Sequence, residues 1–120
     1  MDYESALKIG SAFGGGMGLM GETCGAVTGA FMVIGLKYGS TDAENKTSKA
    51  KTYELVKEFT KRFKARNESI VCRDLIDFDP SEKKDLHPDE WLKIIEKCPE
   101  YITSAAEILE EILADSHDKT

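Results

Sequence analysis

Glycine is confined to one stretch of this chain: all ten glycines lie between Gly10 and Gly39, and four of them fall in the run Gly14-Gly15-Gly16-Met17-Gly18. Each glycine weakens a helix by about 1 kcal/mol relative to alanine, because it has more backbone freedom to lose. The cluster therefore predicts a turn, or a close approach of two backbone segments that larger side chains would block. Cys24 follows the run closely, within Thr23-Cys24-Gly25-Ala26-Val27-Thr28-Gly29, so its thiol is a candidate functional group.

Helices are predicted on both sides of the glycine run, over residues 3–12 and 22–38. The second helix is apolar nearly all round, which is typical of a helix at the centre of a bundle or across a membrane. Its apolar stretch is shorter than the span of about 20 residues that a membrane requires, so we expect no transmembrane segment. Gly21, Gly25 and Gly29 recur every four residues and predict a smooth stripe against which a neighbouring helix packs closely.

The rest of the chain also favours helices. A third helix is predicted over residues 42–66, short helical turns over 72–76 and 80–85, a helix from Pro88 through residue 97, and a last helix from Pro99. Apolar residues spaced by three and four mark the buried faces of the third and last helices: Tyr53, Val56, Phe59 and Phe63 in one, and Ile102, Ala105, Ala106, Leu109, Ile112 and Leu113 in the other.

These patterns predict an all-α fold. We expect a single-domain helical bundle over residues 1–114, with four to six helices around the central glycine-rich helix. Residues 115–120 are expected to form a frayed acidic tail.

Composition and charge narrow the classes of function. With 41% hydrophobic and 32% charged residues, the chain suits one soluble domain. Residues 68–120 carry six basic and fifteen acidic side chains, a net charge of −9, which argues against a nucleic-acid partner. Three cysteines are an odd number for a secreted disulfide framework, and Asp2 and Glu4 stand where a signal peptide has basic residues. We therefore expect a cytoplasmic protein with free thiols.

Cys24, Cys72 and Cys98 each stand at or near a predicted helix start. A helix N-terminus favours the thiolate through its dipole and free N–H groups, so all three thiols are predicted to ionise readily. The alternative is that they only fill space, since free cysteine is among the most buried residue types. The chain has no CxxC pair, which excludes a thioredoxin-like motif and a zinc ribbon, and no CxxCH, which excludes covalently attached haem.

Two further sequence patterns near Cys24 match those of ligand sites, but we do not interpret either of them as one. Gly16-Met17-Gly18-Leu19-Met20-Gly21 matches GxGxxG, but a dinucleotide site needs a preceding strand, and the preceding segment is predicted to be helical. Met17 and Met20 are candidate soft-metal ligands beside Cys24, but filling of the core is the preferred interpretation.

Residues 6–18, followed by Cys24-Gly25-Ala26-Val27-Thr28-Gly29, resemble a family of putative redox-active proteins designated C_GCAxxG_C_C. The motif residues are Gly14, Gly15, Gly16, Gly18, Gly25, Ala26 and Gly29. The resemblance covers most of the chain and implies a redox role that rests on the cysteines. Cys72 and Cys98 stand where the two later family cysteines are expected, whereas the first family cysteine, before the glycine run, has no counterpart here.

Three functional hypotheses follow from the residues and the resemblance. The favoured one is a dithiol/disulfide protein in which Cys24 is the reactive thiol, Cys72 or Cys98 resolves it as a disulfide, and an unidentified redox partner exchanges electrons. The first alternative is a module that binds a metal or an iron–sulfur cluster through Cys24, Cys72 and Cys98, with a fourth ligand from a partner subunit in a homo-oligomer or from a small molecule. The second is a non-catalytic helical interaction protein. The sequence does not name a substrate.

Overall fold

The computed structural model describes residues 1–118 and contains six α-helices and two 3₁₀ helices in that range. They are α1 (Tyr3–Gly10), η1 (Ser11–Phe13), α2 (Gly25–Tyr38), α3 (Lys46–Asn67), α4 (Cys72–Ile76), η2 (Pro80–Asp85), α5 (Pro88–Ile94) and α6 (Cys98–Asp118). No β-strand occurs among these residues, and strand-like pairing is limited to one bridge between Thr23 and Val71. The predicted all-α fold with four to six helices is therefore confirmed.

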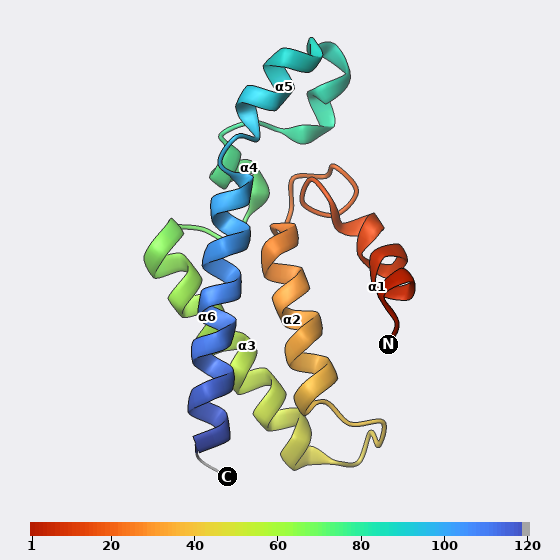
Figure 1. The fold of residues 1–120 in the computed structure, drawn as a ribbon, viewed down its shortest axis with the longest axis vertical. Coiled ribbons are helices and arrows are strands. Elements are labelled where there is room, and N and C mark those ends of the chain that lie inside the picture. Colours follow the sequence, from red (N-terminus) through yellow and green to blue (C-terminus); the bar gives the residue numbers. More distant parts are fainter. Residues whose placement is uncertain (119–120) are drawn as a thin grey trace.

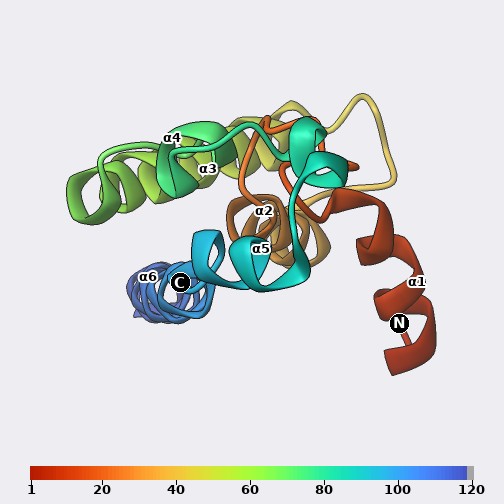
Figure 2. The same ribbon diagram turned by 90° about the horizontal axis from the view of Figure 1, so that it is seen from above.

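Three long helices form the body of the molecule. α2 packs against both α3 and α6, and α3 also packs against α6, so each of the three contacts the other two. Figure 1 shows α2 and α6 side by side with α3 crossing both, while α4 and α5 lie towards one end. Seen from above in Figure 2, α3 lies on one side of the α2–α6 pair, and α1 projects away from the bundle. No helix in the described part of the chain is long and apolar enough to span a membrane.

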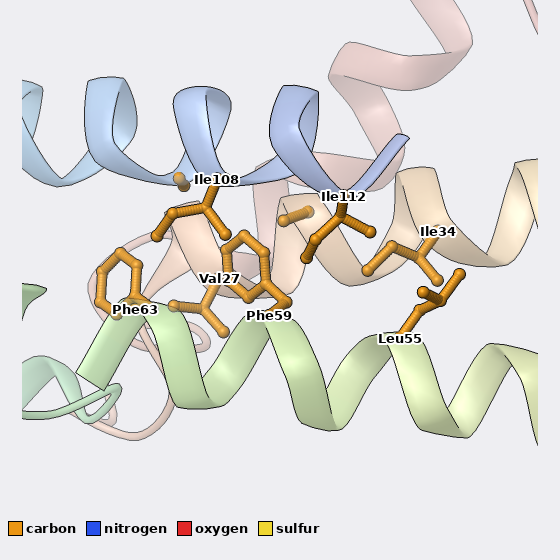
Figure 3. Close-up of a cluster of buried hydrophobic side chains, with 9 residues drawn as sticks. Val27, Ile34, Leu55, Phe59, Phe63, Ile108 and Ile112 are labelled. Atoms are coloured by element: carbon orange, nitrogen blue, oxygen red, sulfur yellow. The ribbon is translucent and has the colours of Figure 1, made fainter. Parts of the chain in front are cut away.

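The core is built from one apolar face of each long helix (Figure 3). The side chains that fill it are Val27 and Ile34 of α2, Leu55, Phe59 and Phe63 of α3, and Ile108 and Ile112 of α6. The ring centroids of Phe59 and Phe63 are 5.9 Å apart, and Phe31 meets the Phe59 ring edge-on at 5.8 Å. Such aromatic pairs add about 0.5–1.5 kcal/mol to the burial of their surface.

Three residues predicted to face inward are exposed instead. The periodicity placed Tyr53 on the buried face of α3, but the structure buries Leu55 and leaves Tyr53 54% exposed. Ile102 and Ala106 were predicted to face the interior from α6 and are both exposed, Ile102 to 60%. Spacing alone does not show which face of a helix a neighbouring helix covers.

Ion pairs also link α3 to α6. Arg62 forms ion pairs with Glu111 and Asp115, and Arg66 forms ion pairs with Glu107 and Glu111. The basic end of α3 is thus matched to the acidic face of α6. Exposed pairs of this kind contribute about 0–1 kcal/mol each, so they orient the two helices more than they stabilise them.

The helix boundaries differ from the prediction by a few residues. α3 begins at Lys46 because the side chain of Asn45 caps it, accepting a hydrogen bond of 3.0 Å from the backbone N–H of Ser48. α6 continues to Asp118, beyond Ala114 where the domain was predicted to end, so the first part of the expected frayed tail is helical. Residues 119–120 of that tail lie outside the described residues.

We expect the substitution Phe59→Ala to lower the free energy of unfolding by about 3–5 kcal/mol, because it leaves a cavity where three helices meet. Tyr53→Ala on the same helix is the matched control and should change it by less than about 1 kcal/mol, because that side chain is exposed. Urea denaturation followed by circular dichroism measures both. Equal losses for the two variants would show that this core is wrongly placed.

Candidate functional site

The glycine run forms a left-handed turn. Residues 15–19 all have φ between +59° and +69°. The turn is closed by backbone hydrogen bonds in which the N–H of Leu19 donates to the carbonyl of Gly14, and the N–H of Gly21 to that of Gly15, both at 3.0 Å. A left-handed conformation costs a residue with a side chain about 1–2 kcal/mol, so glycine at three of the five positions removes most of that cost.

This turn lies directly against the start of α4. A Cβ atom added at Gly16 would lie 2.6 Å from the Cβ of Cys72 and 2.6 Å from the backbone nitrogen of Glu22. A Cβ atom at Gly21 would collide with the side chain of Arg73. The close approach predicted from the glycine cluster therefore exists, and it is an approach to the segment that carries the second cysteine.

A short antiparallel pairing joins the starts of α2 and α4. The N–H of Cys24 donates to the carbonyl of Ile70 at 2.8 Å, and the N–H of Cys72 donates to the carbonyl of Glu22 at 2.6 Å. These bonds flank the Thr23–Val71 bridge, and side chains alternate between the two faces of such a pairing. The alternation directs the side chains of Cys24 and Cys72 to the same face.

Cys98 reaches the same region from the first turn of α6. The hydroxyl of Tyr101, one turn further along, donates to the carbonyl of Leu75 in α4 at 2.8 Å and so ties these two helices together. All three cysteines line one cavity of about 540 Å³, whose walls come from the glycine turn and from α2, α4, α5 and α6. Figure 1 shows that the first turns of α2 and α6 lie at the α4 end of the bundle.

The three thiols differ in burial and are all unbonded. Cys72 is buried, whereas Cys24 and Cys98 are half-buried and can be reached through the cavity. Cys24 is the N-cap of the 14-residue helix α2, where the sequence had placed it inside the first turn. Cys72 is the first residue of the five-residue helix α4.

Burial governs the ionisation of two of these thiols. The pKa of Cys72 is raised to about 11, mostly by burial and in smaller part by the neighbouring Cys24 and Cys98, while Arg73 opposes the shift. Burial also raises the pKa of Cys98, with a smaller contribution from Cys24. The prediction that these two thiols ionise readily is therefore wrong, because the loss of hydration of a thiolate outweighs the benefit of a helix start.

The glycine stripe of α2 does not have the predicted role. A Cβ atom at Gly29 would meet no atom within 4 Å, and one at Gly25 would meet only the carbonyl oxygen of Phe13, at 3.4 Å. Both glycines line the cavity instead of packing against a neighbouring helix. The periodicity located a smooth face correctly, but it could not show that this face borders an open space.

Several cavity residues had no signal as site residues in the sequence. Trp91 and Ile95 from the α5 end and Ile76 from α4 close one side of the cavity, and only their apolar character was evident beforehand. Met17 and Met20, considered as soft-metal ligands, do not line it. Within the described part of the chain, no group of three or more His, Cys, Asp or Glu side chains is arranged to hold a metal ion.

Comparison with known proteins gives one match. A family model described as "Putative redox-active protein (C_GCAxxG_C_C)" matches residues 1–112, which is most of the chain and includes all three cysteines. No curated protein and no solved structure matches the sequence.

We expect Gly16→Ala to lower the free energy of unfolding by more than about 2 kcal/mol, because the new methyl group is strained at positive φ and collides with Cys72. Gly29→Ala is the matched control. It should be neutral or raise the free energy of unfolding by up to about 1 kcal/mol, since it faces open space on a helix. Chemical denaturation of both variants tests this pair, and an equal effect would contradict the packing of the turn on α4.

The ionisation of Cys72 should make stability depend on alkaline pH. The folded protein keeps this proton up to about pH 11, whereas the unfolded chain releases it near pH 9.0, so the unfolded state gains stability between these values. Over this pH window we expect the free energy of unfolding of the wild-type protein to fall by up to about 2 kcal/mol more than that of the Cys72→Ala variant. Denaturation curves at several pH values measure the difference, and identical pH profiles for the two proteins would refute the assignment.

Proposed function

Because this chain belongs to the C_GCAxxG_C_C family, we propose that it is a thiol–disulfide exchange protein whose chemistry resides in Cys24, Cys72 and Cys98. The observation that carries the proposal is the placement of these three cysteines, which come from three separate helix starts and line one cavity. Cys72 and Cys98 follow Cys24 by 48 and 74 positions in the sequence, yet all three reach the same cavity. Thiols that only fill space have no need to share a cavity that reagents can enter.

Cys24 is the reactive thiol in this proposal. It is half-buried, lines the cavity and stands at the N-cap of the 14-residue helix α2, and a helix N-terminus is a position that favours reactive thiols. Cys72 is a poor nucleophile near neutral pH, because burial keeps it protonated with a pKa of about 11. We assign the resolving role to Cys98: burial raises its pKa as well, but unlike Cys72 it is half-buried and can be reached through the cavity.

The reaction is a two-step exchange with an external disulfide. The Cys24 thiolate attacks one sulfur of that disulfide, its S–S bond breaks, and the first thiolate leaves and takes up a proton. The Cys98 thiolate then attacks the sulfur of Cys24 in the mixed disulfide and releases the second thiol of the substrate. The substrate gains two electrons and two protons, and the protein keeps a Cys24–Cys98 disulfide. An external dithiol reverses both steps and restores the free thiols.

The walls of the cavity favour an apolar substrate. They are lined by Trp91, Ile95, Ile102 and Leu109, with glycines and alanines between them, and no charged side chain is among the described residues that line the cavity. Apolar pockets of a few hundred Å³ are typical of sites for small molecules or single apolar side chains. We therefore propose that the substrate disulfide is flanked by apolar groups and not by carboxylates.

The test is titration with a neutral aromatic disulfide such as dipyridyl disulfide, followed by absorbance of the released thione and by mass spectrometry. We expect the wild-type protein and Cys72→Ala to release two equivalents of thione rapidly and to retain an internal disulfide without a mixed adduct. Cys98→Ala should stop at a mixed disulfide on Cys24, after one equivalent. Cys24→Ala should react at least about tenfold more slowly, because the remaining thiols are held protonated.

Two results would contradict the proposal. A stop at the mixed disulfide in Cys72→Ala but not in Cys98→Ala would show that Cys72 resolves the intermediate. A native protein whose three thiols react only after denaturation would make the cysteines packing residues, as the hypothesis of a helical interaction protein requires.

A further inference from the structure

The N-terminal helix α1 leaves its apolar side chains largely exposed. None of its residues is buried, although it is amphipathic, with Tyr3 and Leu7 one turn apart on the same face. Tyr3 is 79% exposed and Leu7 is 57% exposed. Figure 2 shows α1 projecting from the bundle, away from the three packed helices. An isolated helix of eight residues is marginal in water, so its stability depends on burying that face elsewhere.

A second apolar surface is left open on the bundle itself. α3 covers one side of the α2–α6 pair (Figure 2), and none of the described residues that line the cavity between these two helices belongs to α3. Leu36 of α2 is 68% exposed on the face that continues from the cavity, and Ile102 of α6 is exposed at its wall. Gly29 of α2 and Ala106 of α6 are small residues of the cavity wall, and a Cβ atom at Gly29 would meet no atom within 4 Å, so a backbone can approach closely there. We call this surface, made by Gly29, Val33, Leu36, Ile102, Ala106 and Leu109, the open face.

The surface area of the chain shows how much is left uncovered. The accessible surface is 8129 Å², whereas a folded monomer of 13.3 kDa exposes about 6,400 Å². The excess of about 1,700 Å² per chain exceeds the roughly 800 Å² that each partner buries in a standard interface. The radius of gyration, 15.7 Å, is likewise larger than the value of about 13.6 Å for a compact domain of 120 residues.

We propose that a second copy of this chain covers the open face, and that each copy seats its α1 against the α2–α6 pair of the other. The lengths agree: α1 is about 12 Å long, and the stretches from Gly29 to Leu36 and from Ile102 to Leu109 are each about 10 Å long. A reciprocal exchange of this kind closes after two copies, because the same surfaces are used twice across a two-fold axis.

A dimer of this form would complete the cavity. The cysteines lie at the end of the cavity where α2 and α6 begin, and the open face consists of the cavity walls further along the same helices, extended by Leu36. The partner's α1 would therefore wall the cavity along its side and leave the cysteine end uncovered. The proposal does not rest on the redox function, because a dimer can be measured without any chemistry at the thiols.

Sedimentation equilibrium of the full chain under reducing conditions tests the oligomeric state. We expect a monomer–dimer equilibrium for the wild-type protein. Leu7→Glu on α1 and Ile102→Glu on the open face should each weaken the dimer by more than about 100-fold, because the reciprocal dimer loses the same apolar contact twice. Tyr53→Glu is the control: it places the same charge on an exposed aromatic position of α3 outside both surfaces and should leave the equilibrium unchanged.

Mixing the two disrupted variants separates the exchange of α1 from a simple face-to-face contact. A Leu7→Glu chain keeps an intact open face and an Ile102→Glu chain keeps an intact α1, so the mixture retains one of the two contacts and should form a heterodimer more tightly than either variant forms its own dimer. Tyr3→Ser is a milder second variant of α1, and circular dichroism confirms that each variant is folded. A wild-type protein that is monomeric at every concentration, a dimer insensitive to both charge substitutions, or a dimer that Tyr53→Glu disrupts would each overturn the proposal.

Discussion

The arrangement of the cysteines depends on one close contact, that of the glycine turn with the start of α4. Gly16 approaches Cys72 so closely that a single methyl group does not fit between them. This approach lets residues 22–24 pair with residues 70–72, and the pairing starts α2 and α4 from a common point. A larger residue at position 16 would push the two segments apart and separate Cys24 from Cys72. The glycine run thus permits the contact that brings the cysteines together, although it contributes no reactive group itself.

The opposing effects of helix starts and burial determine which thiols can act. Helix N-termini favour thiolates by about 0.3–1 kcal/mol, whereas loss of hydration can shift a pKa by several units in the other direction. At Cys72 burial prevails, and the neighbouring thiols add to its effect. The same cavity that brings the cysteines together therefore limits the number of thiolates it holds. This is suited to exchange of one disulfide at a time and less suited to a site that needs several thiolates at once.

The distribution of charge and apolar surface gives the two sides of the bundle different characters. Basic side chains at the end of α3 form ion pairs with acidic side chains of α6, so the charges on that side are compensated within the chain. The other side of α6 and the adjoining face of α2 are apolar and open, and α1 presents a second apolar face that is also uncovered. Apolar side chains that gather on an uncovered face are typical of an interaction site.

The sequence by itself determined the helical class, the approximate helix positions, the family and the three candidate thiols. Helix periodicity and capping are local properties, so Phe59 and Phe63 could be assigned to the core without knowledge of their neighbours. The tertiary structure alone decided which faces are covered: Tyr53, Ile102 and Gly29 obey the same spacing rules as core residues but lie where no helix of the chain covers them. It also decided the burial of Cys72 and the meeting of three cysteines, because both arise from contacts between segments far apart in sequence. Local pattern carries no information about such contacts, which depend on how the helices pack in three dimensions.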